Sequence, residues 1–255
     1  MSVILKAKNV RKVYGTKSTL FPALNSVSLE VHKGEFVGVM GPSGAGKSTL
    51  LNVLSTIDKA TSGSIAIEGK AFDTMRAKEM AVFRRDKLGF IFQDYNLLDT
   101  MTIQDNIALP LSLSNVKPAE VEQRVQDVMR QFGILDMADK FPNQVSGGQK
   151  QRTAVSRAMV TNPALIFADE PTGALDSKAA TNLLESLVQA QQERHATIMM
   201  VTHDAFAASF CERILFIKDG EIFTEIYRGT ANRKVFFQKV LDVLAMLGGG
   251  LDDTI

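Results

Sequence analysis

Residues 41–49 leave few folds open to this chain. They read Gly-Pro-Ser-Gly-Ala-Gly-Lys-Ser-Thr and fit the pattern G-x-x-x-x-G-K-[ST]. The apolar run Phe36–Met40 precedes the pattern and residues 48–54 follow it at helical spacing, so the required strand, loop and helix are all indicated. Glycines let successive backbone N–H groups converge on phosphate, and the helix N-terminus adds positive potential there. We therefore expect Lys47 to contact the β- and γ-phosphates of a nucleotide and Ser48 to bind Mg²⁺, whereas a purely structural turn would need neither side chain.

The composition narrows the class of protein. At 255 residues and 45% hydrophobic content, the chain can form one sizeable α/β domain, or a domain with a small subdomain. A net charge of +1 with interspersed charges argues against nucleic acid as a partner. The single cysteine, Cys211, excludes an internal disulfide framework, and we find neither a signal peptide nor an apolar run of membrane-spanning length. We expect a cytosolic protein that would reach a membrane only through a partner.

The first third of the chain reads as β-structure around the P-loop strand. Residues 3–30 alternate polar and apolar side chains, with turn residues at Tyr14-Gly15 and Phe21-Pro22, which predicts short antiparallel strands. Residues 61–70 predict a further strand pair. Tyr14 has two interpretations: an aromatic that stacks on a nucleobase, or a half-buried turn residue.

Polar side chains follow three predicted strands at their carboxyl ends, where α/β sheets bind ligands. Gln93 ends a strand that begins near Leu88, and Asp169 and Glu170 follow the buried run Ala164–Ala168. His203 follows the run 196–201. Adjacent residues on a strand point in different directions, so Asp169 can face a metal ion while Glu170 faces an attacking water. Ordinary solvation of these polar side chains is the alternative interpretation.

Helical segments make up most of the remaining sequence. From Ile103 to Phe141 the period is helical, with Pro110 and Pro118 as breaks and a long helix from Ala119 to Phe132. Ser146 and Gln149 fit a capping box at the start of a helix that reaches about Val160. This helix start offers a second anion-binding N-terminus without a lysine, although taken alone it is better explained as the cap of a structural helix.

The last part of the chain combines helices with a hairpin. Asp176 precedes a predicted helix over Ser177 to about Gln192, which it could simply cap. Asp219-Gly220 indicates a β-hairpin, and an amphipathic helix is expected over Asn232–Leu247.

Taken together, these motifs resemble an ATP-binding-cassette (ABC) ATPase, and they occur in that family's order from Tyr14 to His203. The resemblance implies a P-loop NTPase α/β fold of the ABC ATPase type, with a mainly parallel core sheet, an N-terminal antiparallel β subdomain and an inserted α-helical subdomain. It implies an ATPase domain over 1–230 with the helical subdomain at about 95–160, followed by an amphipathic helix and tail at 231–255. Val145 and Gly173 depart from the family's usual Leu and Ser, and neither departure removes a catalytic group.

The resemblance also assigns roles to residues. It implies Glu170 as catalytic base, assisted by His203, Lys47 and Gln93, and it implies an Mg²⁺ site formed by Ser48, Gln93 and Asp169. Leu165–Asp169 resembles the Walker B motif, Val145–Gln149 the signature sequence, and Asp176 the D-loop residue. The ATP-binding residues implied are Tyr14, Gly41, Ser43, Gly44, Ala45, Gly46, Lys47, Ser48, Thr49, Ser146, Gly147, Gly148, Gln149 and Asp176.

Three segments resemble the peptide-antibiotic (bacitracin and lantibiotic) type of transporter ATPase: residues 92–99, residues 147–153, and the tail with Phe236-Phe-Gln and Met246-Leu-Gly-Gly. The lipoprotein-release, macrolide-export and cell-division ATPases of the same branch are similar too. The resemblance implies an ATP-dependent head-to-tail homodimer at the cytoplasmic face of the membrane. It also implies a membrane permease contacted through the loop after Gln93, and an accompanying sensor histidine kinase.

Other function classes fit the sequence less well. The stretch between Gln93 and Ser146 is too short for the coiled coil of a chromosome-organising ATPase, and a translation-factor cassette would carry two P-loops. A switch GTPase would need Asn-Lys-x-Asp, which is absent. A cassette that signals through a membrane partner without moving a substrate remains open.

Overall fold

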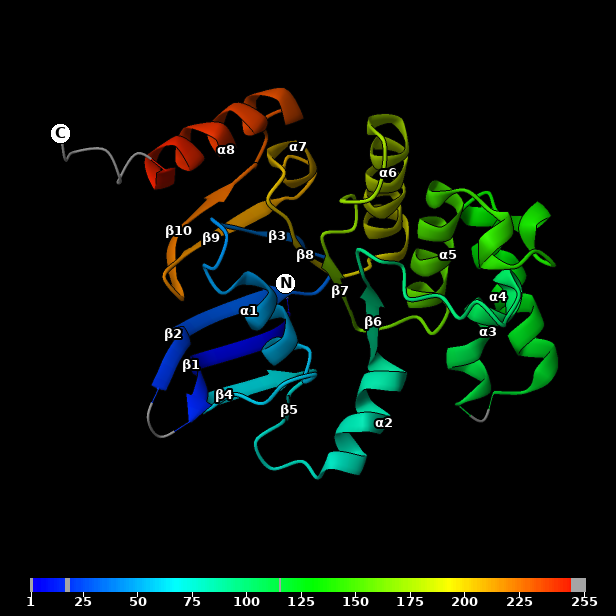
Figure 1. Cartoon of the computed structure of the whole chain (residues 1–255), viewed down its shortest axis with the longest axis horizontal. Coiled ribbons are helices and arrows are strands. Elements are labelled where there is room, and N and C mark those ends of the chain that lie inside the picture. Colours follow the sequence, from blue (N-terminus) through cyan, green and yellow to red (C-terminus); the bar gives the residue numbers. More distant parts are fainter. Residues whose placement is uncertain (1, 17–18, 115, 249–255) are drawn as a thin grey trace.

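The computed structural model describes residues 2–16, 19–114 and 116–248, and two β-sheets organise them (Figure 1). The larger sheet has six strands in the order β10-β9-β3-β8-β7-β6. Strands β9, β3, β8, β7 and β6 are parallel, and β10 pairs antiparallel with β9 at one edge. The bounds are β3 Phe36–Met40, β6 Leu88–Ile91, β7 Leu165–Asp169, β8 Ile198–Val201, β9 Arg213–Lys218 and β10 Glu221–Tyr227. Asp219 and Gly220 both have positive φ in the β9–β10 turn, as the predicted hairpin requires.

The smaller sheet is antiparallel, with the order β2-β1-β4-β5. Its strands are β1 Val3–Thr16, β2 Thr19–His32, β4 Ser62–Ile67 and β5 Lys70–Ala71. The antiparallel pairing expected over residues 3–30 is confirmed, but the strands are long and the turns expected at Tyr14-Gly15 and Phe21-Pro22 do not form. Tyr14 instead pairs with Phe21 inside one hairpin, and Gly15 and Pro22 pair with Leu20 and Val13. Pro22 is tolerated because β2 is an edge strand of this sheet, where a missing N–H leaves no ladder partner unsatisfied.

Ten helical segments of the described chain connect and cover the strands. Helix α1 follows the P-loop, while α3, α4 and α5 form a group on the side of the molecule away from α1, with α5 packed against β6 (Figure 1). Helix α2 has no counterpart among the predicted elements, because only Met80 and Phe83 of it are buried and its apolar period is weak. The bounds are α1 Lys47–Leu54, α2 Ala77–Lys87, α3 Ile103–Ser112, α4 Pro118–Gln131, η1 Leu135–Met137, η2 Pro142–Gln144, α5 Gly147–Met159, α6 Ser177–Arg194, α7 Ala205–Ala208 and α8 Arg233–Gly248.

The two prolines of the helical region behave differently. Pro118 occupies the first position of α4, as a helix break predicts. Pro110 instead lies inside α3, so the predicted break there is wrong. Pro110 falls in the last turn of α3, where it removes only one hydrogen bond. The start of the helix is anchored separately, because the buried Asn106 side chain donates to the carbonyls of Leu98, Met101 and Thr102.

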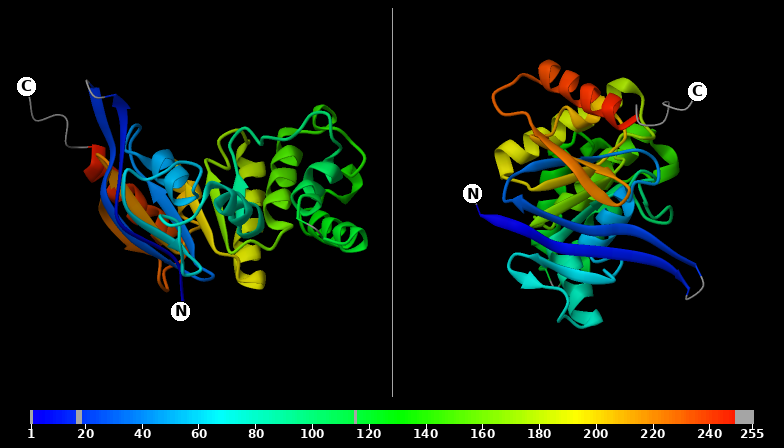
Figure 2. Two further views of the ribbon diagram at one scale, coloured as in Figure 1. Left: turned by 90° about the horizontal axis from the view of Figure 1, so that it is seen from below. Right: turned by 90° about the vertical axis from the view of Figure 1, so that its left-hand side faces the viewer.

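Hydrophobic clusters cover both faces of the larger sheet. Along β3, Phe36 and Met40 belong to the cluster under the helices, while Val37 and Val39 belong to the cluster shared with α1 and the antiparallel sheet. Burial on both faces explains why the parallel strands read as continuous apolar runs. The helices of the first cluster and the antiparallel sheet of the second lie on opposite sides of the larger sheet (Figure 2).

Helix α8 packs with Phe236, Val240 and Leu247 in the helical cluster, while Leu241, expected on the same apolar face, is 37% exposed. Residues 249–255 of the expected tail lie outside the described residues. Among the described helices, none combines the length and the apolar character that crossing a membrane would require.

Candidate functional site

The P-loop backbone lies tightly between strands. Gly41 has φ 157° and Gly46 has φ 100°, backbone angles that residues with a side chain rarely adopt. A Cβ on Gly41 would come within 2.1 Å of the carbonyl oxygen of Ile217, and one on Gly46 within 2.5 Å of that of Ala23. Strands β9 and β2 therefore hold the loop from both sides, and glycine is required at both positions.

Helix α1 begins at Lys47 with its first-turn N–H groups directed at the loop. Its N-cap, Gly46, has no side chain to satisfy them, and the first turn carries no acidic residue. Lys47 Nζ donates to the carbonyls of Gly41 and Pro42, at 2.9 Å each. Burial lowers the pKa of Lys47, and the nearby Glu170 and Asp169 oppose this shift. Ser43, Gly44 and Ser48 are exposed, Thr49 is half-buried and Ala45 is buried, so the loop presents polar groups and backbone outward.

The two predicted acids reach the same edge of the sheet as the P-loop. Strand β8 lies between β3 and β7, with Val39 and Asp169 both registered on Val201. Parallel strands end together, so the P-loop after β3, the acid pair at the end of β7 and His203 beyond β8 share this edge.

Glu170 is held in place by three contacts. Its N–H donates to the Val201 carbonyl at 2.9 Å, and its side chain accepts from Thr202 Oγ1 at 3.2 Å. Its Oε1 lies 2.9 Å from His203 Nδ1. The Glu170 side chain is 17% exposed and that of His203 is 74% exposed. Glu170 also has φ 45°, an uncommon conformation for a non-glycine residue that the surrounding contacts maintain.

Asp169 has an unsatisfied oxygen. Its Oδ1 is buried and accepts no hydrogen bond within the described chain. Burial raises the pKa of Asp169, the neighbouring Glu170 raises it further, and Lys47 opposes them. A buried carboxylate oxygen without a partner is a suitable ligand for a hard divalent cation, so this group fits the expected Mg²⁺.

Gln93 lies two residues beyond the end of β6, so the predicted strand end is displaced. Its side chain lies against Gly173, where a Cβ would be 3.1 Å from Gln93 Cδ. The substitution of Gly173 for the family's usual Ser therefore accommodates Gln93. Among the described residues, Gln93 makes no hydrogen bond to Asp169, whose Oδ1 has no partner.

The segment after Gln93 is anchored to helix α5. Tyr95 and Asn96 both have positive φ, 61° and 48°. Arg157 of α5 donates to their carbonyl oxygens at 2.8 Å and 2.6 Å, and burial lowers its pKa. The Tyr95 hydroxyl donates to the Ala174 carbonyl at 3.5 Å. Sequence reasoning missed Arg157, because a basic residue in the last turn of a helix reads as an ordinary surface residue.

The capped helix start expected at Ser146 is present, but it lies away from the P-loop. Ser146 Oγ accepts from the Gln149 N–H at 3.3 Å and Gln149 Oε1 accepts from the Ser146 N–H at 2.8 Å, which confirms the capping box. Gly147 and Gly148 complete its first turn. Figures 1 and 2 show α1 and α5 well apart, on different sides of β6 and β7. Asp176 caps α6 by accepting from the Ala179 N–H at 2.8 Å, as the structural alternative predicts.

Tyr14 lies beside the P-loop helix. Its hydroxyl donates to Asp58, just beyond the end of α1, at 2.8 Å. Lys12 Nζ lies 4.7 Å from the centre of the Tyr14 ring and 2.7 Å from Asp58. Burial and the hydrogen bond to Asp58 raise the pKa of Tyr14. The ring is 40% exposed, so it is a half-exposed strand residue and the expected turn there does not form.

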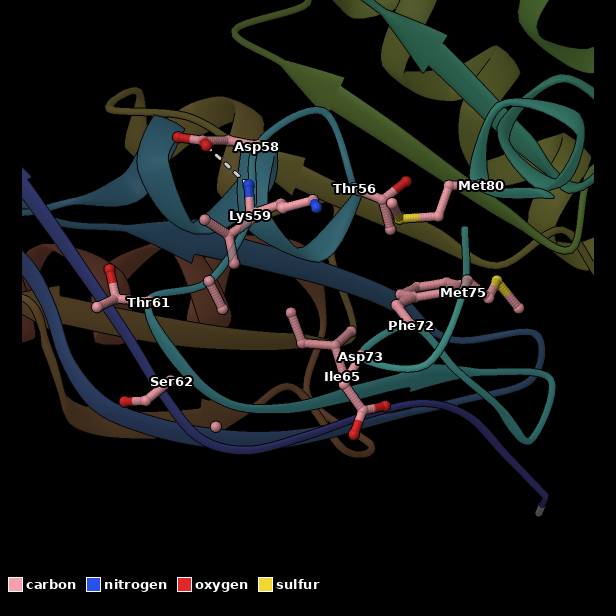
Figure 3. Close-up of a pocket in the computed structure, with 13 residues that line it drawn as sticks. Thr56, Asp58, Lys59, Thr61, Ser62, Ile65, Phe72, Asp73, Met75 and Met80 are labelled. Atoms are coloured by element: carbon pink, nitrogen blue, oxygen red, sulfur yellow. Dashed lines mark hydrogen bonds between the residues drawn. The ribbon is translucent and has the colours of Figure 1, made fainter. Parts of the chain in front are cut away.

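Asp58 also borders a neighbouring pocket of about 310 Å³, seen in Figure 3. Burial alone would raise the pKa of Asp58, but hydrogen bonds from Lys12, Tyr14 and the Lys59 backbone lower it. The rest of the pocket is mixed, with apolar Ile65 and Phe72 beside polar Thr61 and Asp73. It opens between α1, α2 and the antiparallel sheet, and contains neither the P-loop lysine nor the acid pair.

A parallel sheet that places a P-loop lysine and a strand-end acid pair at one edge defines a P-loop nucleotide-binding protein. The chain belongs to the ABC transporter family, whose model matches residues 24–173. It is 50% identical to the bacitracin export ATP-binding protein BceA of Halalkalibacterium halodurans, over 98% of this chain and 99% of that protein. It is 54% identical to the uncharacterized ABC transporter ATP-binding protein YvcR of Bacillus subtilis, over 96% and 95% of the two chains.

A solved structure supports the same fold. The ATP-binding cassette MJ0796, described as a dimer in a post-hydrolysis state bound to ADP and Pi, superposes with a TM-score of 0.81 at 39% identity. The comparison covers 88% of this chain and 98% of that one. The predicted ABC ATPase fold, with its parallel core, antiparallel β layer and helical insertion, is confirmed.

Proposed function

We propose that this chain hydrolyses ATP to power a membrane permease that exports antimicrobial peptides of the bacitracin or lantibiotic kind. The observation that carries the proposal is its similarity, over almost the whole of both chains, to a bacitracin export ATP-binding protein. The regulatory alternative, a cassette that signals without transport, has no specific observation in its favour.

Glu170 acts as the general base in this proposal. The His203 ring and the Thr202 hydroxyl fix its carboxylate, and its partial burial keeps bulk water from competing for the attacking position. Lys47 leaves the Gly41 and Pro42 carbonyls and donates to the β- and γ-phosphates, while the N–H groups of residues 43–49 bind the phosphate oxygens. Tyr14 stacks on the adenine ring, and Gln93 detects the γ-phosphate.

The Mg²⁺ ion would be held by Asp169, Ser48 and Gln93. The partnerless oxygen of Asp169 supports this assignment, and the ion would neutralise charge on the β- and γ-phosphates. Without the ion, the two carboxylates would repel the triphosphate. Asp169 would hold the ion, whereas Glu170 would accept the proton of the attacking water.

Two copies are needed to complete each site. The Ser146 loop with Gly147, Gly148 and Gln149 contacts the ATP that Lys47 of a second copy holds, and Asp176 lies near the same junction. The separation of α1 from α5 within one chain supports a head-to-tail homodimer, because one chain does not bring its own Ser146 loop to its own P-loop.

The permease is proposed to dock beside the loop after Gln93, at the cytoplasmic face of the membrane. A groove of about 470 Å³ there is lined mainly by apolar groups, among them Phe92, Pro110 and Leu113. Leu113 is 60% exposed, and Leu98 of the loop after Gln93 is 43% exposed. Tyr95 of the same loop instead donates its hydroxyl to the Ala174 carbonyl. A sensor kinase would be reached through the permease. Residues 1–230 form the ATPase domain in this proposal, with the helical subdomain at 95–160 and an accessory segment at 231–255.

Glu170→Gln tests the proposal at two levels. ATPase turnover of the purified chain should fall by about 10²- to 10⁴-fold, the usual effect of losing a positioned general base, with ATP binding retained. Bacterial cells that depend on this chain and its permease should lose bacitracin resistance with the same change. Glu185→Gln, an exposed acid on α6, serves as the control and should alter neither.

ATPase turnover and bacitracin resistance test different parts of the proposal. Wild-type turnover in Glu170→Gln would reject Glu170 as the base. Lost turnover with unchanged bacitracin resistance would leave an ATPase with a different cargo.

A further inference from the structure

Phe21 lies directly opposite Tyr14 in the β1–β2 hairpin. The next two pairs toward the tip, Gly15 with Leu20 and Thr16 with Thr19, continue without a register shift. Directly opposite residues of antiparallel strands point to the same face, with Cβ atoms about 4.5–5.5 Å apart. The Phe21 and Tyr14 side chains are therefore neighbours on one face of the hairpin.

That face looks toward the P-loop helix. The Tyr14 hydroxyl donates to Asp58, which follows the end of α1 by four residues, and this hydrogen bond fixes its direction. Farther along β2, the Ala23 carbonyl approaches the P-loop at Gly46. A nucleotide whose phosphates lie in the P-loop would extend its base toward this pair of aromatic rings.

Both rings retain free surface. Phe21 is 61% exposed and belongs to neither hydrophobic cluster of the core. Lys12 covers one face of the Tyr14 ring, with Nζ 4.7 Å from the ring centre, which leaves the other face for a ligand. Exposed aromatic rings of this kind bind flat bases by stacking and van der Waals contact.

We propose that Phe21 extends the stacking surface of Tyr14 into a two-ring platform that favours purine over pyrimidine nucleotides. The fused rings of adenine are long enough to contact both side chains, whereas the single ring of cytosine contacts mainly Tyr14. This inference rests on the proposed role of Tyr14 and adds a residue that determines base specificity.

Calorimetric titration of the full chain with ATP and with CTP tests the platform, in the Glu170→Gln background so that nucleotide is not consumed. Phe21→Ala should weaken ATP binding by about 5- to 10-fold, toward the lower end of the effect of base–aromatic stacking, and CTP binding by less than about twofold. Phe21→Tyr should retain the affinity for ATP. Leu20→Ala is the matched control, because Leu20 is 66% exposed, adjacent in sequence and on the opposite face. It should bind both nucleotides like the parent.

The outcomes separate this inference from the proposal beneath it. Unchanged ATP affinity in Phe21→Ala, with weakened binding in Tyr14→Ala, would overturn the platform and retain Tyr14 as the stacking residue. Unchanged affinity in both variants would place the base elsewhere and reject the role of Tyr14 as well. Equal losses for ATP and CTP, or a loss of ATP-dependent dimerisation with normal ATP affinity, would also overturn the inference.

Discussion

At the scale of single residues, Asp169 is a charge that the folded chain compensates poorly. Its raised pKa means that the native state holds a proton more tightly than the unfolded chain. The resulting destabilisation is complete above the folded-state pKa, and it disappears as the pH falls below the unfolded value. A residue kept at such a cost to stability is typical of a functional site.

Asp169→Asn should therefore stabilise the nucleotide-free chain at pH 7. We expect a gain of roughly 1 kcal/mol, seen as an increase of about 2–4 °C in Tm for a chain of this size, because a neutral amide is cheaper to bury than a carboxylate. The gain should shrink as the pH is lowered through the carboxyl range. Thermal unfolding with Asp139→Asn, an exposed acid, as control measures it. A variant less stable than wild type at neutral pH would contradict the expectation.

Residues whose role is local were predictable from sequence, and residues that act through distant partners were not. The P-loop spacing indicates Lys47, and a buried strand followed by two acids indicates Glu170. Asp58 and Thr202 had no such signal. Asp58 meets Tyr14 only because the antiparallel sheet lies against α1, and Thr202 meets Glu170 only because β7 and β8 are adjacent.

At the scale of elements, helix α5 is connected through the loop after β6 to the sheet edge that carries the P-loop and the two acids. Tyr95 and Asn96 are held with positive φ, which costs about 1–3 kcal/mol per residue, and the Arg157 guanidinium offsets this by donating to both carbonyls. The same limit on sequence reasoning applies here. A pattern predicts where a loop begins, but not which helix anchors it.

Arg157→Met should release this loop while keeping an apolar side chain of similar length. Loss of two charge-assisted hydrogen bonds should raise amide hydrogen exchange across residues 93–98 by about 10-fold or more. Arg130→Met on α4 is the control, because Arg130 contacts only side chains of its own helix. Unchanged exchange in Arg157→Met, measured by hydrogen–deuterium exchange and mass spectrometry, would show that other contacts hold the loop.

At the scale of the whole molecule, the two helix N-termini proposed to contact nucleotide, those of α1 and α5, lie well apart. Helix α1 follows the P-loop and carries Lys47, whereas α5 begins with the Ser146 capping box and its first three residues, Gly147, Gly148 and Gln149, are uncharged. If each nucleotide lies between two copies, as proposed, this separation leaves each copy to supply one half of each site. A two-fold symmetric dimer would then contain two equivalent composite sites.

Mixing two inactive variants tests this arrangement. Lys47→Ala removes the charge on the phosphates and Ser146→Arg places a bulky side chain at the junction, so each homodimer should lack ATPase activity. In a mixed dimer, one site combines the intact Lys47 of one copy with the intact Ser146 of the other. With half of the dimers mixed and one of two sites intact in each, an equimolar mixture should recover about a quarter of wild-type turnover. Lys47→Ala mixed with the double variant is the control and should recover none, since no P-loop lysine remains. Equal activity in the two mixtures would mean that each chain completes its own site.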